Sequence, residues 1–193
     1  MPSNIEIKAR LDDTATTEAR ARALCGAPTA QLDQRDTFYP CAEGRLKLRV
    51  IAAQAGGHAA GDVRGELIHY LRADCNGPRR SDYQIAAVAR PDELRAVLDA
   101  ACGALLTVRK RRHLYLHGRT RIHIDRVESL GDFVELEVVL KPGEDPAAGD
   151  AEAQSLMAEL GIADHQLVAG AYADLLAVDG KGVARAPATD GRN

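Results

Sequence analysis

Residues 119–137 read Arg-Thr-Arg-Ile-His-Ile-Asp-Arg-Val-Glu-Ser-Leu-Gly-Asp-Phe-Val-Glu-Leu-Glu, and this stretch decides how the chain folds. Apolar and charged residues alternate along both of its halves, which is the period of a β-strand. A short segment with a glycine between the halves has the composition of a tight turn. Side chains two residues apart in a strand share a face, so Ile122 and Ile124 oppose His123 and Asp125. The stretch therefore predicts two adjacent antiparallel strands, each with one apolar and one ionic face.

The same alternation recurs along the chain and predicts about eight strands, most of them joined by short turns. Short turns favour an antiparallel sheet or barrel over parallel strands with helical crossovers. The Gly- and Ala-rich residues 52–64 are expected to form a loop. The expected strands cover residues 4–10, 31–39, 45–51, 66–72, 82–88, 105–117, 119–127 and 133–140. The expected helices cover residues 15–25, 91–101, 148–160 and 164–177.

Length and composition limit the class of protein. The chain has 193 residues, 46% of them hydrophobic, which suits one folded domain and excludes wholesale disorder. Its 25 Lys and Arg residues against 28 Asp and Glu residues give a net charge of −3, which argues against a general nucleic-acid binder. No apolar run is long enough for a transmembrane helix, so no membrane partner is expected, and the first residues do not form a secretory signal.

The cysteines and the last residues indicate where the protein works and where its domain ends. Cys25, Cys41, Cys75 and Cys102 lie far apart in sequence, so neither a zinc site nor a redox pair is expected. We therefore expect four reduced thiols in a cytoplasmic protein. Residues 1–177 are expected to form the domain. Residues 178–193 have little to bury and are expected to form a disordered tail.

The ionic faces of the expected strands are segregated by sign. Lys47 and Arg49 lie on a basic face, whereas Glu135 and Glu137 lie on an acidic one. Like charges on one face repel, so this segregation needs opposite charges across the sheet or in a ligand. If the sheet closes, the bases can clamp phosphate oxygens and the acids can hold Mg²⁺ or Mn²⁺. The run at 109–112 puts two bases on each face, and the alternation alone does not decide which pair points inward.

Several short motifs follow one another in a definite order. They are Asn-Ile-Glu-Ile-Lys at 4–8, Asp36–Tyr39, Arg45–Arg49, Arg109–Arg112, Arg121–Asp125, Leu130–Glu137 and Ala171–Leu176. Together they resemble the CYTH superfamily, which includes class IV adenylyl cyclases, thiamine triphosphatases and inorganic triphosphatases folded as triphosphate tunnels. The resemblance covers residues 3–177. It implies an α+β fold, in which an eight-stranded antiparallel β-barrel has helices packed outside.

The resemblance also implies roles for the charged residues. The residues that would contact the triphosphate are Lys8, Lys47, Arg49, Arg72, Lys110, Arg112 and Arg121. Those that would hold the metal are Glu6, Asp125, Glu135 and Glu137, and Glu135 or Glu137 would also orient the attacking water. Lys110 and Arg112 would then face inward. At the family's first Glu this chain has Asn4, which offers a carbonyl oxygen without charge.

Three functions compete at this point. The first is metal-dependent hydrolysis of tripolyphosphate, thiamine triphosphate or a nucleoside triphosphate. The second is a class IV adenylyl cyclase, and the third is a module that binds a nucleotide or polyphosphate without turnover. The chain has no Trp, 2 Phe and 5 Tyr, so an aromatic pocket for adenine is not evident and hydrolysis is favoured. The oligomeric state stays open, with a homodimer as one arrangement.

Overall fold

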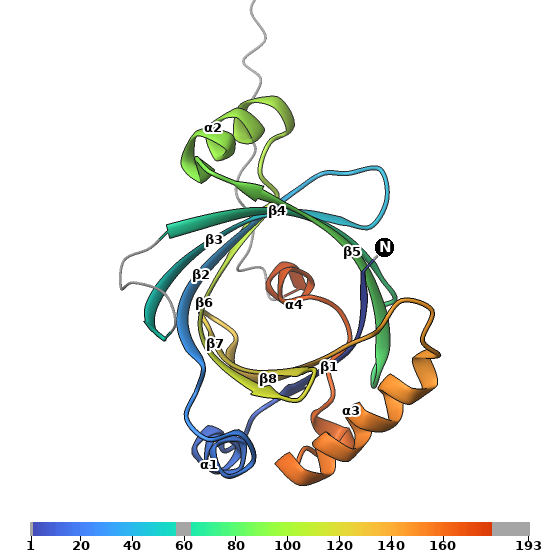
Figure 1. The fold of residues 1–193 in the computed structure, drawn as a ribbon. Helices are drawn as coiled ribbons and strands as arrows, with labels where there is room; N and C mark the ends of the chain where they lie inside the picture. The colour runs from blue at the N-terminus through green and yellow to red at the C-terminus, as the bar shows by residue number, and fades with distance from the viewer. Residues whose placement is uncertain (1, 57–62, 179–193) are drawn as a thin grey trace, which may run out of the picture.

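Eight antiparallel strands form a closed barrel in the computed structural model, which describes residues 2–56 and 63–178 (Figure 1). The strands are β1 (Ser3–Arg10), β2 (Ala30–Tyr39), β3 (Arg45–Gly56), β4 (Val63–Arg72), β5 (Arg79–Val88), β6 (Leu106–His117), β7 (Thr120–Val127) and β8 (Gly131–Val139). The helices of the described residues are α1 (Thr14–Cys25), α2 (Pro91–Cys102), α3 (Pro146–Leu160) and α4 (Tyr172–Val178), with a 3-10 turn, η1, at Asp164–Gln166.

The strands follow the order β1-β5-β4-β3-β2-β6-β7-β8 around the barrel, and every neighbouring pair is antiparallel. Strand β1 closes the ring, because Ser3–Glu6 pair with β5 while Asn4–Arg10 pair with β8. Closure removes the exposed sheet edges at which other chains could pair. The predicted antiparallel barrel and α+β class are confirmed.

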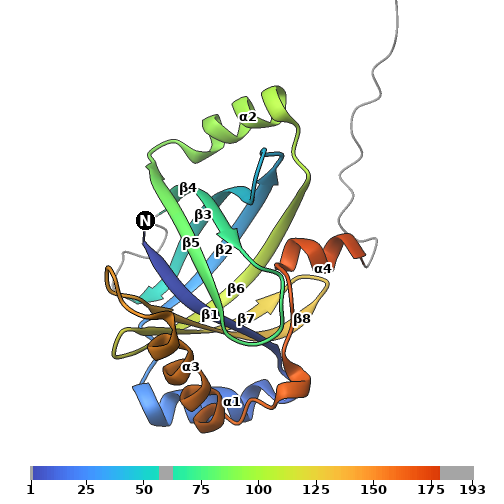
Figure 2. The same cartoon turned by 90° about the vertical axis from the view of Figure 1, so that its right-hand side faces the viewer.

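The apolar faces of β1, β7 and β8 point out of the barrel. Ile5, Ile122 and Leu136 are at most 1% exposed and belong to one core cluster with Ala21 of α1 and Leu156 of α3. Figure 2 shows α1 and α3 side by side below these strands. Because the alternation puts opposite residues on opposite faces, covering the apolar faces with helices turns the ionic faces into the lumen.

The segment expected to be one helix over 164–177 is divided, so that prediction is wrong. Only η1 and α4 are helical, and the residues between them run extended along the end of β1. Leu167 forms an isolated antiparallel bridge with Ala9, and the Val168 amide donates to the Lys8 carbonyl at 2.9 Å. Pairing with a strand therefore satisfies backbone groups that a helix would have satisfied internally.

Helix α4 caps one end of the barrel. It lies inside the ring in Figure 1 and at one end of it in Figure 2. Tyr172 and Leu176 pack in a second core cluster with Phe38, Val108 and Phe133. The rings of Phe133 and Tyr172 meet edge to face, 5.0 Å apart at 69°. The expectation of helices outside the barrel therefore holds for α1, α2 and α3, whereas α4 closes an end.

Part of the loop expected at 52–64 is strand. β3 continues to Gly56 and β4 begins at Val63, with Ala52 paired to Val63. Small residues favour loops locally, but here β3 is hydrogen-bonded to β2 on one side and to β4 on the other. Residues 57–62 and 179–193, which include the centre of the expected loop and nearly all of the expected tail, lie outside the described residues.

Two smaller expectations are also tested. All four cysteines, which lie among the described residues, are free thiols, as the sequence predicts. None of the helices within 2–56 and 63–178 combines the length and apolar character needed to cross a membrane.

Replacing a residue beneath the outer helices should destabilise the barrel. Leu136 is fully buried under α3, so Leu136→Ala should lower the free energy of unfolding by about 2–5 kcal/mol through lost apolar burial and the cavity left behind. Urea denaturation would measure the loss. Leu116→Ala is the matched control, because that side chain is 47% exposed and should cost well under about 1 kcal/mol. Equal losses in the two variants would contradict the packing described here.

Candidate functional site

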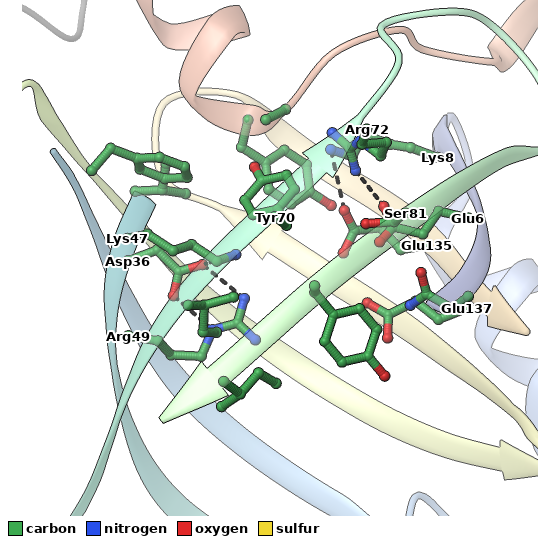
Figure 3. A pocket seen from close by; sticks show the side chains of 18 of the residues that line it. Glu6, Lys8, Asp36, Lys47, Arg49, Tyr70, Arg72, Ser81, Glu135 and Glu137 are labelled. Carbon is green, nitrogen blue, oxygen red and sulfur yellow. Dashed lines mark hydrogen bonds and ion pairs between the residues drawn. The ribbon is translucent and has the colours of Figure 1, made fainter. Parts of the chain in front are cut away.

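The barrel lumen contains a cavity to which all eight strands contribute side chains. Its lining contains six bases and four acids, a formal excess of two positive charges. The bases are Lys8, Lys47, Arg49, Arg72, Lys110 and Arg121, and the acids are Glu6, Asp36, Glu135 and Glu137. Figure 3 shows Asp36, Lys47 and Arg49 on one side of the cavity and Glu6, Glu135 and Glu137 on the other.

Most of the site residues expected from the sequence meet in this cavity. Six of the seven expected bases and three of the four expected acids line it. Arg112 and Asp125 are the exceptions, since both are buried in the barrel but are not part of the lining. Both Lys110 and Arg112 are buried, whereas Arg109 and Arg111 are exposed, so the inward pair is the one that the family resemblance implies.

Asp125 lies behind the cavity lining, and three side chains donate hydrogen bonds to its carboxylate. Its carboxylate accepts from Arg112 Nε at 2.6 Å, from Lys110 Nζ at 2.9 Å and from the Tyr172 hydroxyl at 3.0 Å. Burial alone would raise the pKa of Asp125, but Arg112 and Lys110 lower it to about 2. The carboxylate therefore stays charged and ties β6, β7 and α4 together.

Asp36 lines the cavity, although the sequence did not assign it a metal or phosphate role. Lys47 Nζ donates to it at 3.0 Å, and Arg49 donates through Nε and Nη2, each at 2.8 Å. These charges hold the pKa of Asp36 well below its usual value, although its burial alone would raise it. The signal that could have identified it was an acidic side chain in the strand next to the basic strand β3, where Asp36 pairs in register with Arg49.

The acids of β1 and β8 form the opposite wall. Glu6 and Glu137 are directly paired in register, and Lys8 is paired with Glu135. Glu6 forms an ion pair with Arg72, and Arg121 Nε donates to Glu137 at 2.8 Å. Ion pairs among the described lining residues therefore join neighbouring strands, as between Arg121 and Glu137, and also strands that are not adjacent, as between Arg72 of β4 and Glu6 of β1.

Glu135 and Glu137 are held in their charged forms. Burial would raise the pKa of Glu137, but His123 and then Arg121 and Arg112 lower it to about 2. Lys110 and Lys8 likewise hold the pKa of Glu135 well below its usual value against the effect of burial. Both carboxylates are therefore available at neutral pH as ligands for a cation.

The lumen also meets the chemical requirements of a divalent metal site. One donor atom each from His123, Glu135 and Glu137 lies within 4.8 Å of the other two. Carboxylate oxygens are the usual ligands of Mg²⁺ and suit Mn²⁺ equally. Glu6 is directly opposite Glu137 across the β1–β8 ladder and can add another oxygen. The residues present therefore fit a divalent ion.

The few aromatic residues are concentrated at the site, which composition alone does not reveal. Phe38, Tyr70, Tyr83 and Tyr172 all line the cavity. Lys8 Nζ lies 3.9 Å from the ring centroid of Tyr172. The small number of aromatic residues disfavours a nucleobase pocket, but their clustering in the cavity weakens that expectation.

A closed barrel with ion pairs across its lumen defines a class of tunnel-shaped proteins, and the sequence of this chain places it within that class. The model of the CYTH domain family matches residues 3–172. The chain belongs to the CYTH family. No curated protein matches it closely enough to count as a relative.

Solved structures share the fold at low sequence identity. The PH1012 protein of Pyrococcus horikoshii OT3 has 20% identity and a TM-score of 0.71, with 88% of this chain and 96% of that chain covered. The PH1819 protein of the same organism has 19% identity and a TM-score of 0.72, with 91% and 99% covered. HpAC1 from Hippeastrum, described as having a dominant triphosphatase activity, has 16% identity and a TM-score of 0.57, with 92% and 96% covered.

The buried Asp36 cluster yields a stability prediction. Asp36→Asn leaves Lys47 and Arg49 without their shared counter-charge, so it should lower the free energy of unfolding at pH 7 by about 3 kcal/mol. Chemical denaturation would measure this, with Glu128→Gln as control because Glu128 is 68% exposed and lies 3.9 Å from its partner. A loss no larger than that of the control would show that the cluster does not depend on Asp36.

Proposed function

We propose that this protein is a divalent-metal-dependent phosphohydrolase that binds a triphosphate in the barrel lumen. The observation that carries the proposal is the excess of two positive charges among the cavity-lining residues. A triphosphate chain with one divalent ion carries about two to three negative charges near neutral pH, so the two are complementary. Membership of the CYTH family supports the same substrate class.

Binding would proceed by an exchange of partners. In the described structure the Asp36 carboxylate accepts hydrogen bonds from Lys47 and Arg49, and Glu6 forms an ion pair with Arg72. Phosphate oxygens would replace these carboxylates, since the guanidinium fork binds both groups with the same two-point geometry. The substrate-binding residues in this proposal are Lys8, Lys47, Arg49, Arg72, Lys110 and Arg121. We assign Arg112 a positioning role, because it holds Asp125 and Glu135.

Glu6, Glu135 and Glu137 would hold Mg²⁺ or Mn²⁺. The bound ion would supply charge neutralisation at the reacting phosphates. Asp125 is assigned to positioning, because Lys110, Arg112 and Tyr172 already occupy its oxygens.

The bases would hold the phosphates in line for attack by water. A carboxylate, Glu135 or Glu137, would orient that water. The water oxygen forms a bond to the terminal phosphorus as the phosphoanhydride bond to the bridging oxygen breaks. Orthophosphate and the shortened phosphate chain leave.

A nucleotide substrate is the second candidate, because of the side chains at one edge of the cavity. Tyr83 and Ile85 of β5 both line it, and Ile85 is 53% exposed, so it lies where the cavity meets solvent. An aromatic and an aliphatic side chain there can contact a nucleobase while the phosphates lie deeper. A nucleoside triphosphate could then be hydrolysed, or cyclised by attack of its 3′-hydroxyl on the α-phosphate.

Product analysis would separate these reactions. The protein is incubated with tripolyphosphate, thiamine triphosphate or ATP and either Mg²⁺ or Mn²⁺. Orthophosphate is expected, whereas cyclic AMP with diphosphate would identify a cyclase. Tight binding without product over hours would instead identify a binding module and contradict both enzyme proposals.

Removing one acidic charge from the proposed metal site should abolish turnover. Glu135→Gln should lower metal-dependent phosphate release by about a hundredfold or more, since the side chain loses its charge but keeps its shape. Glu128→Gln, on the exposed surface of the barrel, is the control. Circular dichroism would check that both variants fold. Undiminished turnover in folded Glu135→Gln would remove Glu135 from the site.

The lysines predict how binding depends on pH. Burial lowers the pKa values of Lys8 and Lys47 to about 8 each, so both ammonium groups lose their protons as the pH rises above 8. Without metal, tripolyphosphate affinity should therefore fall by about tenfold or more between pH 7 and pH 9. Calorimetric titration would measure it. In Lys47→Met the pH dependence should be smaller, and an unchanged dependence would exclude Lys47 as a phosphate contact.

A further inference from the structure

His123 is buried behind the cavity lining and has a nitrogen without a hydrogen-bond partner. It lies on β7 between β6 and β8, and its side chain is 5% exposed. Its Nδ1 atom is buried and has no hydrogen-bond partner. Most buried polar atoms are hydrogen-bonded, so an unpaired nitrogen here indicates that something else occupies its lone pair in the working protein.

The unpaired nitrogen is directed at two carboxylates. Nδ1 lies 3.6 Å from Glu137 Oε1 and 3.9 Å from Glu135 Oε2. Both distances are too long for a hydrogen bond. Two ligands that are each about 2.1 Å from one ion lie about 3.0 Å apart at a right angle and at most about 4.2 Å apart. Both distances therefore fit three ligands that share one ion.

The cluster is distinctive within the part of the chain that the structure describes. Across residues 2–56 and 63–178, these three side chains form the one group of His, Cys, Asp or Glu donors near enough to share an ion. Asn4 is 2% exposed, lines the cavity with Glu135 and Glu137, and also has an unpaired oxygen, Oδ1. Asn4 therefore offers a neutral oxygen in the lumen where the family resemblance implies an acid.

We infer that His123 is a nitrogen ligand of the divalent ion, together with Glu135 and Glu137, and that this site selects Mn²⁺ or a similar transition ion over Mg²⁺. The inference rests on the metal site of the proposed function and adds a ligand to it. Mg²⁺ takes oxygen ligands and keeps its waters, whereas imidazole nitrogen suits transition ions. The two carboxylates of Glu135 and Glu137 match the double charge of the ion, and the imidazole adds a donor without adding charge.

Pulsed electron paramagnetic resonance of Mn²⁺ added to the full chain tests the inference directly. A histidine ligand gives a modulation from its ¹⁴N nucleus, and this pattern should change when the protein is labelled with ¹⁵N-histidine. The measurement uses the unmutated protein and so does not depend on how a variant folds. Mn²⁺ that binds without nitrogen modulation would overturn the inference.

Affinity measurements give a second, independent readout. His123→Gln replaces the nitrogen with an amide oxygen, so calorimetric affinity for Mn²⁺ should fall by about tenfold or more while that for Mg²⁺ changes by less than about threefold. His113→Gln is the matched control, since His113 Nδ1 lies 2.9 Å from Glu18 and His113 is not part of the three-residue donor group. An unchanged preference for Mn²⁺ over Mg²⁺ in His123→Gln would overturn the inference.

These outcomes separate the inference from the proposed function. Nitrogen-ligated Mn²⁺ without phosphate release from any triphosphate would support the metal ligand and contradict the hydrolase. Phosphate release at equal rates with Mg²⁺ and Mn²⁺, with no nitrogen modulation, would support the hydrolase and contradict the ligand.

Discussion

A charged side chain inside a protein needs an opposite charge within reach, and this requirement organises the whole barrel. The helices α1 and α3 cover the apolar faces of β1, β7 and β8 from outside, so the ionic faces of the same strands turn into the lumen. Each base then needs an acid on a neighbouring strand. The pair between Asp36 and Arg49 joins β2 to β3, and the pair between Glu137 and Arg121 joins β8 to β7. These two ion pairs connect strands that also share backbone hydrogen bonds, whereas the pair between Glu6 and Arg72 connects β1 to β4 across β5.

The same pairs determine what the lumen can bind. A ligand that enters the lumen must replace the negative charge that the acids now present to the bases. The acids, once separated from the bases, need a cation as their new partner. A metal–triphosphate complex meets both conditions, whereas an anion alone would leave the acidic wall unpaired. Helix α4 contributes Tyr172 at one end of the lumen. The Tyr172 hydroxyl donates a hydrogen bond to Asp125, and the Tyr172 ring lies against Lys8 and Lys110. The capped end of the lumen is therefore part of the site.

Local patterns predicted the elements well where alternation or helix spacing was strong, as in 119–137, and less well where tertiary contacts overrode them. Residues 164–177 have helical spacing, yet Val168 pairs with β1 instead. Ala52 is locally suited to a loop, yet β3 needs it to extend the ladder to β4. The sequence predicted most of the charged residues that line the cavity, because side chains two apart in a strand share a face. The sequence did not predict that Asp125 and Arg112 lie behind the cavity lining, because the depth of a side chain within a barrel depends on how the strands tilt and twist.

The sequence by itself determined that the chain forms alternating strands, that their ionic faces carry segregated charges, and that its motifs resemble one family. These follow from spacing along one strand, where the period of two is set by backbone geometry. Only the tertiary structure decided which charges meet, because partners on different strands depend on register. The ladder register put Glu6 opposite Glu137 and brought His123 near Glu135 and Glu137 of β8. It also gathered four of seven aromatic side chains into the lumen, because closure of the barrel brings together residues far apart in the chain.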